Sequence, residues 1–433
     1  MGLYKVGVII ALTLIVLSYI KDGFKTRVPP AEVYGYHHPA FKRVAEKFRD
    51  NIKSGKERGA AIAVYIKDEL VVNMWGGFAD MEALRPWSEN TITVANSVSK
   101  GIVGIIVATF VEKGLLKYEC PVTDYWPEFG QNGKENITVE MLLSHQAGLT
   151  VIDPGVSLID VRDNPLKVEK ILAQQSPMWT PGTVQAYHTL TYGLFLDALI
   201  RKVDPQHRDT PTIFYEDIAK PFGLDMYMNT PTTEYYRTAR VYEDSIDTML
   251  LEALFLEDYR DLCMNLKYYP DSIVVRSLKS VLEYTKGVSV HNNPELRNIP
   301  NSCCYGTGTA RGFAKLYSIL SNGGNYKGRQ LLSETAINRL STPVVSGYDV
   351  TLTSNITYGL GSRIKRNSKG NHVMWGYTGH GGQAVWADTT NHISIAYLTN
   401  YFSLYGNGDD PRYLSLEEAV YDSLQEYAGE NLK

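Results

Sequence analysis

Apolar residues dominate the run from Gly101 to Val111, with hardly a polar side chain on any face. A helix with this pattern is buried on all sides, so the run predicts a helix in the interior of the protein. The segment just before it, from Ala95 to Lys100, is small and polar, which is typical of a loop that leads into the first turn of a helix. The rest of the chain is expected to pack around this element.

Elsewhere the pattern alternates between helical and extended periods. Apolar residues at helical spacing predict a helix over 41–52, and two β-rich runs separated by a polar break predict a hairpin over 60–75. Ser415 with Glu418 forms a capping box that predicts the start of a final helix. Further helices are predicted over 194–203 and 313–320, and three late β-like runs over 372–377, 383–387 and 393–398.

Strands at both ends of the chain with helices between them predict an α/β protein. One sheet is completed by the C-terminal part, and a helical lobe is inserted in the middle. We expect residues 1–28 to form an N-terminal segment and linker, and residues 29–433 to form one domain whose helical lobe spans roughly 120–300. The stretch 225–300 is polar and rich in tyrosine, and its helical part at 246–255 is expected to belong to a cap over the site.

The start of the chain has the features of a targeting segment. A lysine precedes an apolar run, Val6–Ile20, that is short for a full membrane span. No small-residue cleavage site follows the run, which favours an uncleaved signal anchor over a signal peptide. Basic residues after the run favour a cytosolic domain, whereas sequons at Asn136 and Asn355 favour a glycoprotein of the secretory pathway. We expect a single-pass membrane protein or a secreted protein, with mitochondrial import as the alternative.

Composition argues against several partners. The 433 residues carry a net charge of −4, which leaves no basic surface for a nucleic acid. The four cysteines are compatible with disulfides or with buried free thiols, although the neighbours Cys303 and Cys304 are not expected to pair with each other. No spacing of cysteines and histidines matches a metal site, so no metal or cofactor is expected. The oligomeric state stays open.

Ser97 and Lys100 are the candidate reactive residues. Three positions apart, they share one face of a helix, and polar groups at the mouth of a buried helix are costly unless they are used. A neighbouring base activates a serine as a nucleophile. The alternative is a serine that caps the helix next to a solvated lysine. Ser362 and Lys365 repeat the spacing, but no apolar helix follows them, so we treat that copy as a coincidence.

Three separated segments together resemble one superfamily, that of the class C-type serine β-lactamases and penicillin-binding proteins. Ser97 and Lys100 stand at the nucleophile motif, Tyr187-His188-Thr189 where the family has Tyr-x-Asn or Tyr-x-Ser, and Tyr377-Thr378-Gly379 where it has Lys-Thr-Gly or His-Thr-Gly. The resemblance covers roughly residues 40–428 and is strongest to the β-lactamase-like carboxylesterases, including eukaryotic proteins with a β-lactamase-related domain. It implies a β-lactamase/transpeptidase-like fold, with an antiparallel sheet flanked by helices and an inserted all-helical lobe.

The resemblance also implies the site residues. Ser97 would be the nucleophile, and Lys100 and Tyr187 would share proton transfer, with the identity of the base left open. The backbone N–H groups of Ser97 and His380 would form the oxyanion hole. Substrate would be bound by five residues of the other two motifs, namely His188, Thr189, Tyr377, Thr378 and Gly379.

Two departures from the family pattern bear on the substrate. Tyr377 is neutral where the family has a residue that helps to hold a substrate carboxylate, and Thr189 replaces an asparagine that binds an amide side chain. Both favour esters over β-lactams or D-Ala peptides. The sequence therefore predicts a serine hydrolase, a carboxylesterase or transesterase that acts through an acyl-serine on small or lipid-like esters. The alternatives are a peptidase of the same fold and an inactive binding or scaffold protein. The chain contains no Gly-x-Ser-x-Gly and no His-Glu-x-x-His, which argues against other hydrolase classes.

Overall fold

The computed structural model describes residues 31–430, and the chain from Glu32 onward forms one compact unit. The apolar run at 6–20, and with it the predicted anchor, lies outside the described residues. Within residues 31–430, no helix combines the length and the apolar character needed to cross a membrane.

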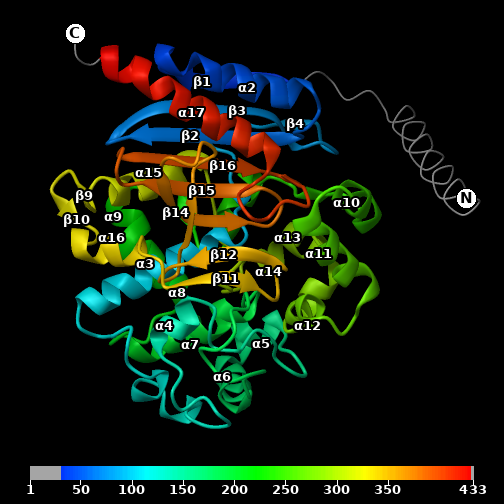
Figure 1. The fold of residues 1–433 in the computed structure, drawn as a ribbon, viewed down its shortest axis with the longest axis vertical. Coiled ribbons are helices and arrows are strands. Elements are labelled where there is room, and N and C mark those ends of the chain that lie inside the picture. Colours follow the sequence, from blue (N-terminus) through cyan, green and yellow to red (C-terminus); the bar gives the residue numbers. More distant parts are fainter. Residues whose placement is uncertain (1–30, 431–433) are drawn as a thin grey trace, which may run out of the picture. The chain divides into compact units, whose positions relative to one another are not determined.

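Ten strands form one antiparallel sheet (Figure 1). Their order is β1-β3-β2-β16-β15-β14-β13-β12-β11, with β4 beside β3. The sheet thus joins strands from the two ends of the chain, as the pattern of β-like runs predicts. Its strands are β1 (Val33–His37), β2 (Gly59–Ile66), β3 (Glu69–Asp80), β4 (Arg85–Pro86), β11 (Val345–Asp349), β12 (Ser354–Tyr358), β13 (Arg363–Arg366), β14 (Val373–Gly379), β15 (Gln383–Asp388) and β16 (Ile393–Thr399).

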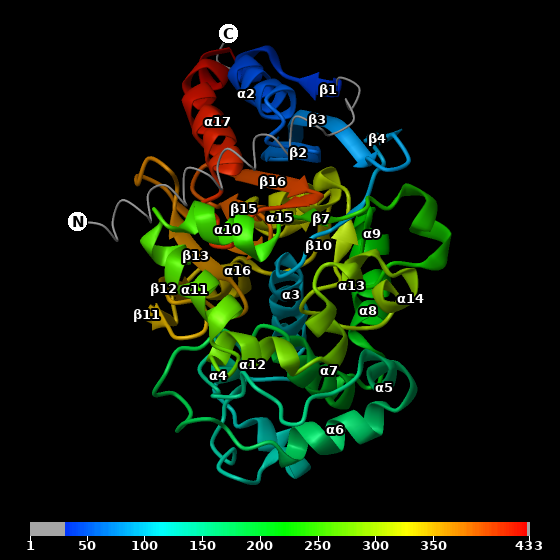
Figure 2. The same cartoon turned by 90° about the vertical axis from the view of Figure 1, so that its right-hand side faces the viewer.

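The centre of the sheet is buried on both faces. Every residue of β2, β15 and β16 is buried, which explains why these strands read as continuous apolar runs. Helices α2 (Lys42–Lys53) and α17 (Pro411–Glu430) cover one face, and α15 (Ala310–Ser321) covers the other (Figure 2). Helix α3 (Val98–Glu112) packs against β14 with nearly every side chain buried, as its all-round apolar pattern predicts.

Most of the remaining helices lie below α3 or beside it in Figure 2. They come from the middle of the chain and from the polar, tyrosine-rich stretch 225–300. The lobe contains α4 (Val139–Leu143), α5 (Leu158–Asp163), α6 (Pro165–Gln174), α7 (Thr191–Val203), α8 (Thr210–Ile213) and α9 (Lys220–Phe222). The later stretch contains α10 (Ile246–Ala253), α11 (Glu257–Tyr268), α12 (Ile273–Lys279), α13 (Ser289–Asn292) and α14 (Pro294–Arg297), and α16 (Glu334–Leu340) follows α15.

Pairs of short strands connect segments that are far apart in the sequence. Strand β8 (Thr307–Gly308) lies between β5 (Thr93–Val94) and β6 (Met226–Tyr227), so the segment before Ser97 is paired with the loop that precedes α15. Two small pairs complete the set, β7 (Tyr242–Glu243) with β17 (Tyr401–Phe402) and β9 (Asn325–Tyr326) with β10 (Arg329–Gln330).

The elements of the structure differ from the predicted ones in two respects. The last helix begins at Pro411 instead of Ser415, because the Asp410 carboxylate accepts a hydrogen bond from the Arg412 N–H at 2.8 Å and takes the capping role. Strands β1, β11, β12 and β13 were not predicted. Residues in β11 alternate between partly buried and exposed positions at the sheet edge, so the apolar signal there is weak.

Candidate active site

Ser97 lies at the junction of a tight loop and helix α3. The backbone of Asn96 has φ +48°, a left-handed conformation that asparagine tolerates better than most residues. The Asn96 side-chain amide donates to the His380 carbonyl at 2.9 Å, and the Ser99 hydroxyl donates to the Asn96 carbonyl at 2.5 Å. The Ser97 hydroxyl itself caps no backbone N–H of α3. The helix-cap alternative therefore does not apply to Ser97.

Lys100 is fully buried, and its side-chain nitrogen has three oxygen neighbours. Nζ lies 3.0 Å from Ser97 Oγ, 2.8 Å from the Thr189 carbonyl and 3.2 Å from the Cys303 carbonyl. Because the two carbonyls accept two N–H groups, the remaining position of the nitrogen faces the serine. Burial disfavours the ammonium charge, but interactions with Tyr187 and with two nearby thiols outweigh burial and raise the pKa of Lys100 above its ordinary value.

Tyr187 joins Ser97 and Lys100 from a distant segment. Lys100 Nζ lies 4.8 Å from the centre of the Tyr187 ring, and the electrostatic interaction between the two side chains contributes to the raised pKa of the amine. The Tyr187 ring is buried and stacks parallel to the Tyr358 ring, with the ring centres 6.4 Å apart. The structure thus brings together the three residues expected to carry catalysis.

The end of β14 is pressed against the Ser97 loop. A Cβ at Gly379 would lie 2.4 Å from the Ala95 carbonyl oxygen, so only glycine fits there. This close approach sets the His380 N–H, which follows the strand, beside the Ser97 loop. Neither the Ser97 N–H nor the His380 N–H donates a hydrogen bond to any residue in the part of the chain that the structure describes. Both are thus available to bind a developing oxyanion.

Tyr377 is held by a histidine that the sequence analysis left out of the site. His145 is completely buried, and its Nε2 lies 2.8 Å from the Tyr377 hydroxyl oxygen. The His188 N–H donates to His145 Nδ1 at 3.2 Å, so the neutral ring carries its proton on Nε2 and donates it to Tyr377. Burial, helped by nearby positive charges, holds the pKa of His145 far below its usual range. Tyr377 is therefore fixed by a neutral donor. In the sequence, His145 is a single histidine between Ser144 and Gln146, and it lies outside the three motifs that carry the resemblance.

Thr378 faces a buried cation. Its hydroxyl donates to the Gly406 carbonyl at 2.7 Å and accepts from the Arg363 guanidinium at 2.5 Å. Arg363 also donates to the Gly406 carbonyl at 3.1 Å and to the Asn407 side chain at 3.0 Å. The guanidinium is thus engaged by groups of the protein itself.

Thr189 and His188 differ in their relation to the site. The Thr189 carbonyl accepts from Lys100, and its hydroxyl lies 3.1 Å from the Ser277 hydroxyl. The His188 ring is almost fully buried, and its Nδ1 donates to the Ala186 carbonyl at 2.8 Å while its Nε2 accepts from the Leu149 N–H at 3.0 Å. Burial lowers the pKa of His188 to about 4. His188 thus links two backbone segments and has no ring nitrogen left for a substrate.

The His380 side chain lies on the outer side of the site. It is half exposed, and its Nε2 lies 2.5 Å from a Glu243 carboxylate oxygen. The hydrogen bond with Glu243 and the negative charge of its carboxylate stabilise the imidazolium and raise the pKa of His380. The His380 backbone and side chain therefore face different partners.

Other predicted sites can be located as well. The two sequon asparagines, Asn136 and Asn355, are exposed. Within residues 31–430, no group of three or more His, Cys, Asp or Glu side chains is arranged to hold a metal ion.

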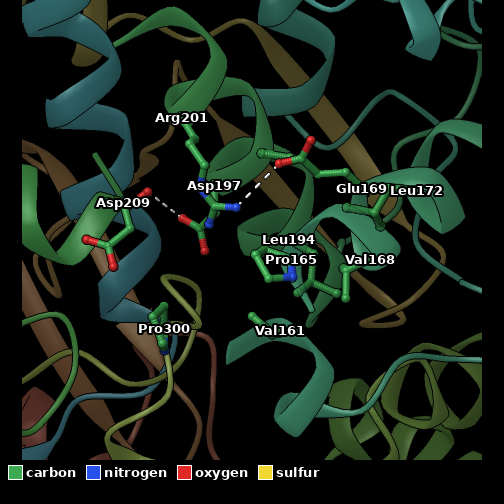
Figure 3. Close-up of a pocket in the computed structure, with 12 residues that line it drawn as sticks. Val161, Pro165, Val168, Glu169, Leu172, Leu194, Asp197, Arg201, Asp209 and Pro300 are labelled. Carbon is green, nitrogen blue, oxygen red and sulfur yellow. Dashed lines mark hydrogen bonds and ion pairs between the residues drawn. The ribbon is translucent and has the colours of Figure 1, made fainter. Parts of the chain in front are cut away.

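A small cavity of about 30 Å³ lies in the helical lobe, away from the residues described above (Figure 3). An ion pair between Arg201 and Glu169 lies along it, at 3.3 Å. Asp197 accepts from the Thr210 hydroxyl at 2.7 Å and from the Ser302 N–H at 3.2 Å. This cavity has room for little more than a water molecule, and its polar groups hold the loop next to Cys303.

Comparison with known proteins identifies a matching family and similar proteins. The model of the family described as Beta-lactamase matches residues 44–419. The "Esterase/beta-lactamase LipL" of Mycobacterium tuberculosis is 27% identical over 386 residues, which cover 85% of this chain and 83% of LipL.

Solved structures are similar over almost the whole described chain. A family VIII carboxylesterase matches with a TM-score of 0.78 and 28% identity over 90% of this chain and 100% of its own. A penicillin-binding protein homolog from Caulobacter crescentus matches with a TM-score of 0.75 and 30% identity over the same shares. The expected β-lactamase/transpeptidase-like fold is confirmed.

Proposed function

The chain belongs to the beta-lactamase family of serine hydrolases, and within that family we propose that it is a carboxylesterase or transesterase that works through an acyl-Ser97 intermediate. One observation carries the proposal: Lys100 Nζ lies 3.0 Å from Ser97 Oγ, while two backbone carbonyls hold the rest of the amine. A hydroxyl that caps no helix and faces a buried amine is placed for nucleophilic attack.

Proton transfer is shared between Lys100 and Tyr187 in this proposal. Lys100 Nζ contacts Ser97 Oγ and lies beside the Tyr187 ring, so the Ser97 proton passes to this pair of side chains, and the raised pKa of Lys100 favours the positive charge that stabilises the pair. The developing oxyanion binds the N–H groups of Ser97 and His380. The alcohol then leaves with a proton, and water or a second alcohol attacks the acyl-serine to release the acid or a new ester.

The groups around the end of β14 favour neutral substrates. Tyr377 supplies no charge, and its hydroxyl is engaged by His145. The nearby Arg363 guanidinium is used by Thr378, Gly406 and Asn407. A β-lactam carboxylate would therefore find no free cation among these groups. The names of LipL, an esterase/β-lactamase, and of the family VIII carboxylesterase support an ester substrate.

The test compares an ester with the anilide of the same acyl group and with a β-lactam. The full chain is assayed with p-nitrophenyl butyrate, with the matching p-nitroanilide and with a chromogenic cephalosporin, beside Ser97→Ala. We expect turnover of the ester alone, and none by the variant. Comparable turnover of the anilide would favour a peptidase, comparable turnover of the cephalosporin would favour a β-lactamase, and a folded chain inert to all three would favour a binding protein. A series of longer acyl chains then separates small esters from lipid-like ones.

We also propose, from the apolar run at 6–20 and the two sequons, that the protein enters the secretory pathway and is held there by its N-terminal segment. Exposure of Asn136 and Asn355 is compatible with glycans at both. Treatment of the expressed protein with an N-glycosidase should increase its gel mobility. Unchanged mobility, together with mitochondrial fractionation, would support import into mitochondria instead.

A further inference from the structure

Two neighbouring thiols lie next to the catalytic lysine. Cys303 and Cys304 follow each other in the loop between α14 and β8, and their sulfur atoms are 3.2 Å apart. Cys303 is fully buried, and Cys304 is 5% exposed. Both are free thiols in this structure, as are the remote Cys120 and Cys263. The sulfurs would have to approach by about 1.1 Å to reach the disulfide bond length of about 2.05 Å.

The loop around the thiols is fixed at its start. The Asn301 carbonyl accepts from the N–H groups of Cys304 and Tyr305 at 3.1 and 3.2 Å, and Asp197 accepts from the Ser302 N–H at 3.2 Å. This turn presents both sulfurs on the same side, although a bond between neighbouring cysteines was not expected from the sequence alone. The structure thus supplies a juxtaposition that the sequence could not reveal.

The peptide that joins the two cysteines also serves Lys100. The Cys303 carbonyl is one of the two backbone acceptors of Lys100, at 3.2 Å. A disulfide between Cys303 and Cys304 would close a ring of eight atoms that contains this same peptide group. Because a peptide is planar and stiff, closure of so small a ring must turn the carbonyl, and Lys100 would lose or lengthen one of its three contacts.

We propose that Cys303 and Cys304 form a peroxide-sensitive dithiol, and that its oxidation to a disulfide slows acylation of Ser97 by removing an acceptor from Lys100. The second half of this inference rests on the proposed function. The first half, formation of the bond, does not depend on activity.

The oxidation balances with one molecule of hydrogen peroxide. The Cys304 thiolate attacks one peroxide oxygen, the O–O bond breaks, and the hydroxide that leaves takes up a proton to become water. The Cys303 thiol then attacks the sulfenic sulfur, the S–S bond forms, and a second water leaves. Two thiols are oxidised and one peroxide is reduced to two waters.

Local charge supports Cys304 as the attacking group. Burial alone would raise the pKa of the Cys304 thiol, but the hydrogen bond with Cys303 and the positive charge of Lys100 outweigh burial and lower the pKa to about 7. A thiol of this kind is partly ionised at neutral pH. The near-complete burial of the pair favours a small oxidant over a bulky disulfide.

The experiment reads the bond and the activity separately. The full chain is treated with hydrogen peroxide, the excess is removed, remaining thiols are alkylated in denaturant, and the tryptic peptide 298–311 is weighed. We expect this peptide to lose two hydrogen atoms and to take up no alkylating agent. Ester turnover should fall by more than about tenfold, since a hydrogen bond to a charged group is lost, and dithiothreitol should restore it. Cys304→Ala should turn over ester before treatment and keep its rate after it, whereas the control Cys263→Ala should respond like the parent chain.

Several results would overturn the proposal. These are a peptide that gains two oxygens instead of losing two hydrogens, a disulfide that forms without loss of turnover, and reversible inhibition that persists in Cys304→Ala. A chain that shows no ester turnover before oxidation would count against the proposed function, while the peptide mass would still report on the bond.

Discussion

The spacing Ser-x-x-Lys occurs in two regions of the described chain, and the two regions use it in opposite ways. In the first, Ser97 and Lys100 lie at the start of helix α3, and their side chains meet at 3.0 Å. In the second, Ser362 precedes strand β13, and its hydroxyl donates to the Leu340 carbonyl. Lys365 there pairs with Glu417 at 2.7 Å.

Backbone conformation accounts for the contrast. On a helix, residues three apart share a face, whereas on a strand they point to opposite faces. The Ser97 N–H in the helical copy donates to no described residue, while the extended copy lies in a sheet with its polar groups engaged. A Ser-x-x-Lys motif can therefore act in catalysis only where the local backbone brings its serine and lysine side chains together.

The largest expected effect separates the two serines. Ser97→Ala should lower kcat/KM for p-nitrophenyl butyrate by at least about 10⁴-fold, because no other group would attack the ester. Ser362→Ala should change kcat/KM by less than about twofold, since only one hydrogen bond to the backbone is lost. Steady-state rates on folded variants check both. A Ser97→Ala variant that kept most of the parent rate would show that Ser97 is not the nucleophile.

The two lysines should differ in which property they change. Lys100→Met should lower kcat/KM by about 10³-fold through loss of proton transfer. Lys365→Met should leave kcat/KM near that of the parent chain but lower the free energy of unfolding by about 3 kcal/mol, because buried Glu417 would keep an unpaired charge. Rates and denaturant unfolding curves measure the split. Equal loss of activity in both variants would contradict the contrast.

Acid should affect the Ser97 region through His188. The pKa of His188 is about 4 in the folded chain, against about 6.5 when unfolded, so the unfolded chain binds the extra proton first as pH falls. The stability that His188 contributes is fully present above pH 6.5 and is lost as pH falls toward 4, by about 3 kcal/mol. The free energy of unfolding, plotted against pH between 7 and 4, should therefore fall less steeply for His188→Gln than for the parent chain. Parallel curves would show that His188 is protonated without cost.

The smallest expected effect concerns Tyr377. Tyr377→Phe would leave the buried His145 donor without its acceptor, which should cost about 1–3 kcal/mol of stability and lower kcat/KM by about tenfold through displacement of β14. Tyr348→Phe, at an exposed position of β11, is the matched control and should change neither quantity. If both variants behaved alike, the Tyr377 hydroxyl would have no part in shaping the site.

Local periodicity in the sequence was enough to predict several helices and strands. The all-round apolar run after Lys100 predicted α3, and the late β-like runs predicted β14 to β16. It could not reveal the acceptors of Lys100, because the carbonyls of Thr189 and Cys303 are backbone groups 89 and 203 residues away and have no side-chain signature. The contact between His145 and Tyr377 spans 232 residues and was likewise visible only in the fold. Resemblance located the three motifs, and the structure placed them within reach of one another.

The most direct test of Ser97 as the nucleophile is the site of covalent labelling. The full chain is treated with a fluorophosphonate, which reacts with an activated serine, and the adduct is mapped by peptide mass in the parent chain and in Ser97→Ala. If Ser97 is the nucleophile, the parent chain forms one adduct, on Ser97, which is absent from Ser97→Ala and still forms in Ser362→Ala. An adduct on Ser362, or labelling that survives in Ser97→Ala, would show that Ser97 is not the nucleophile.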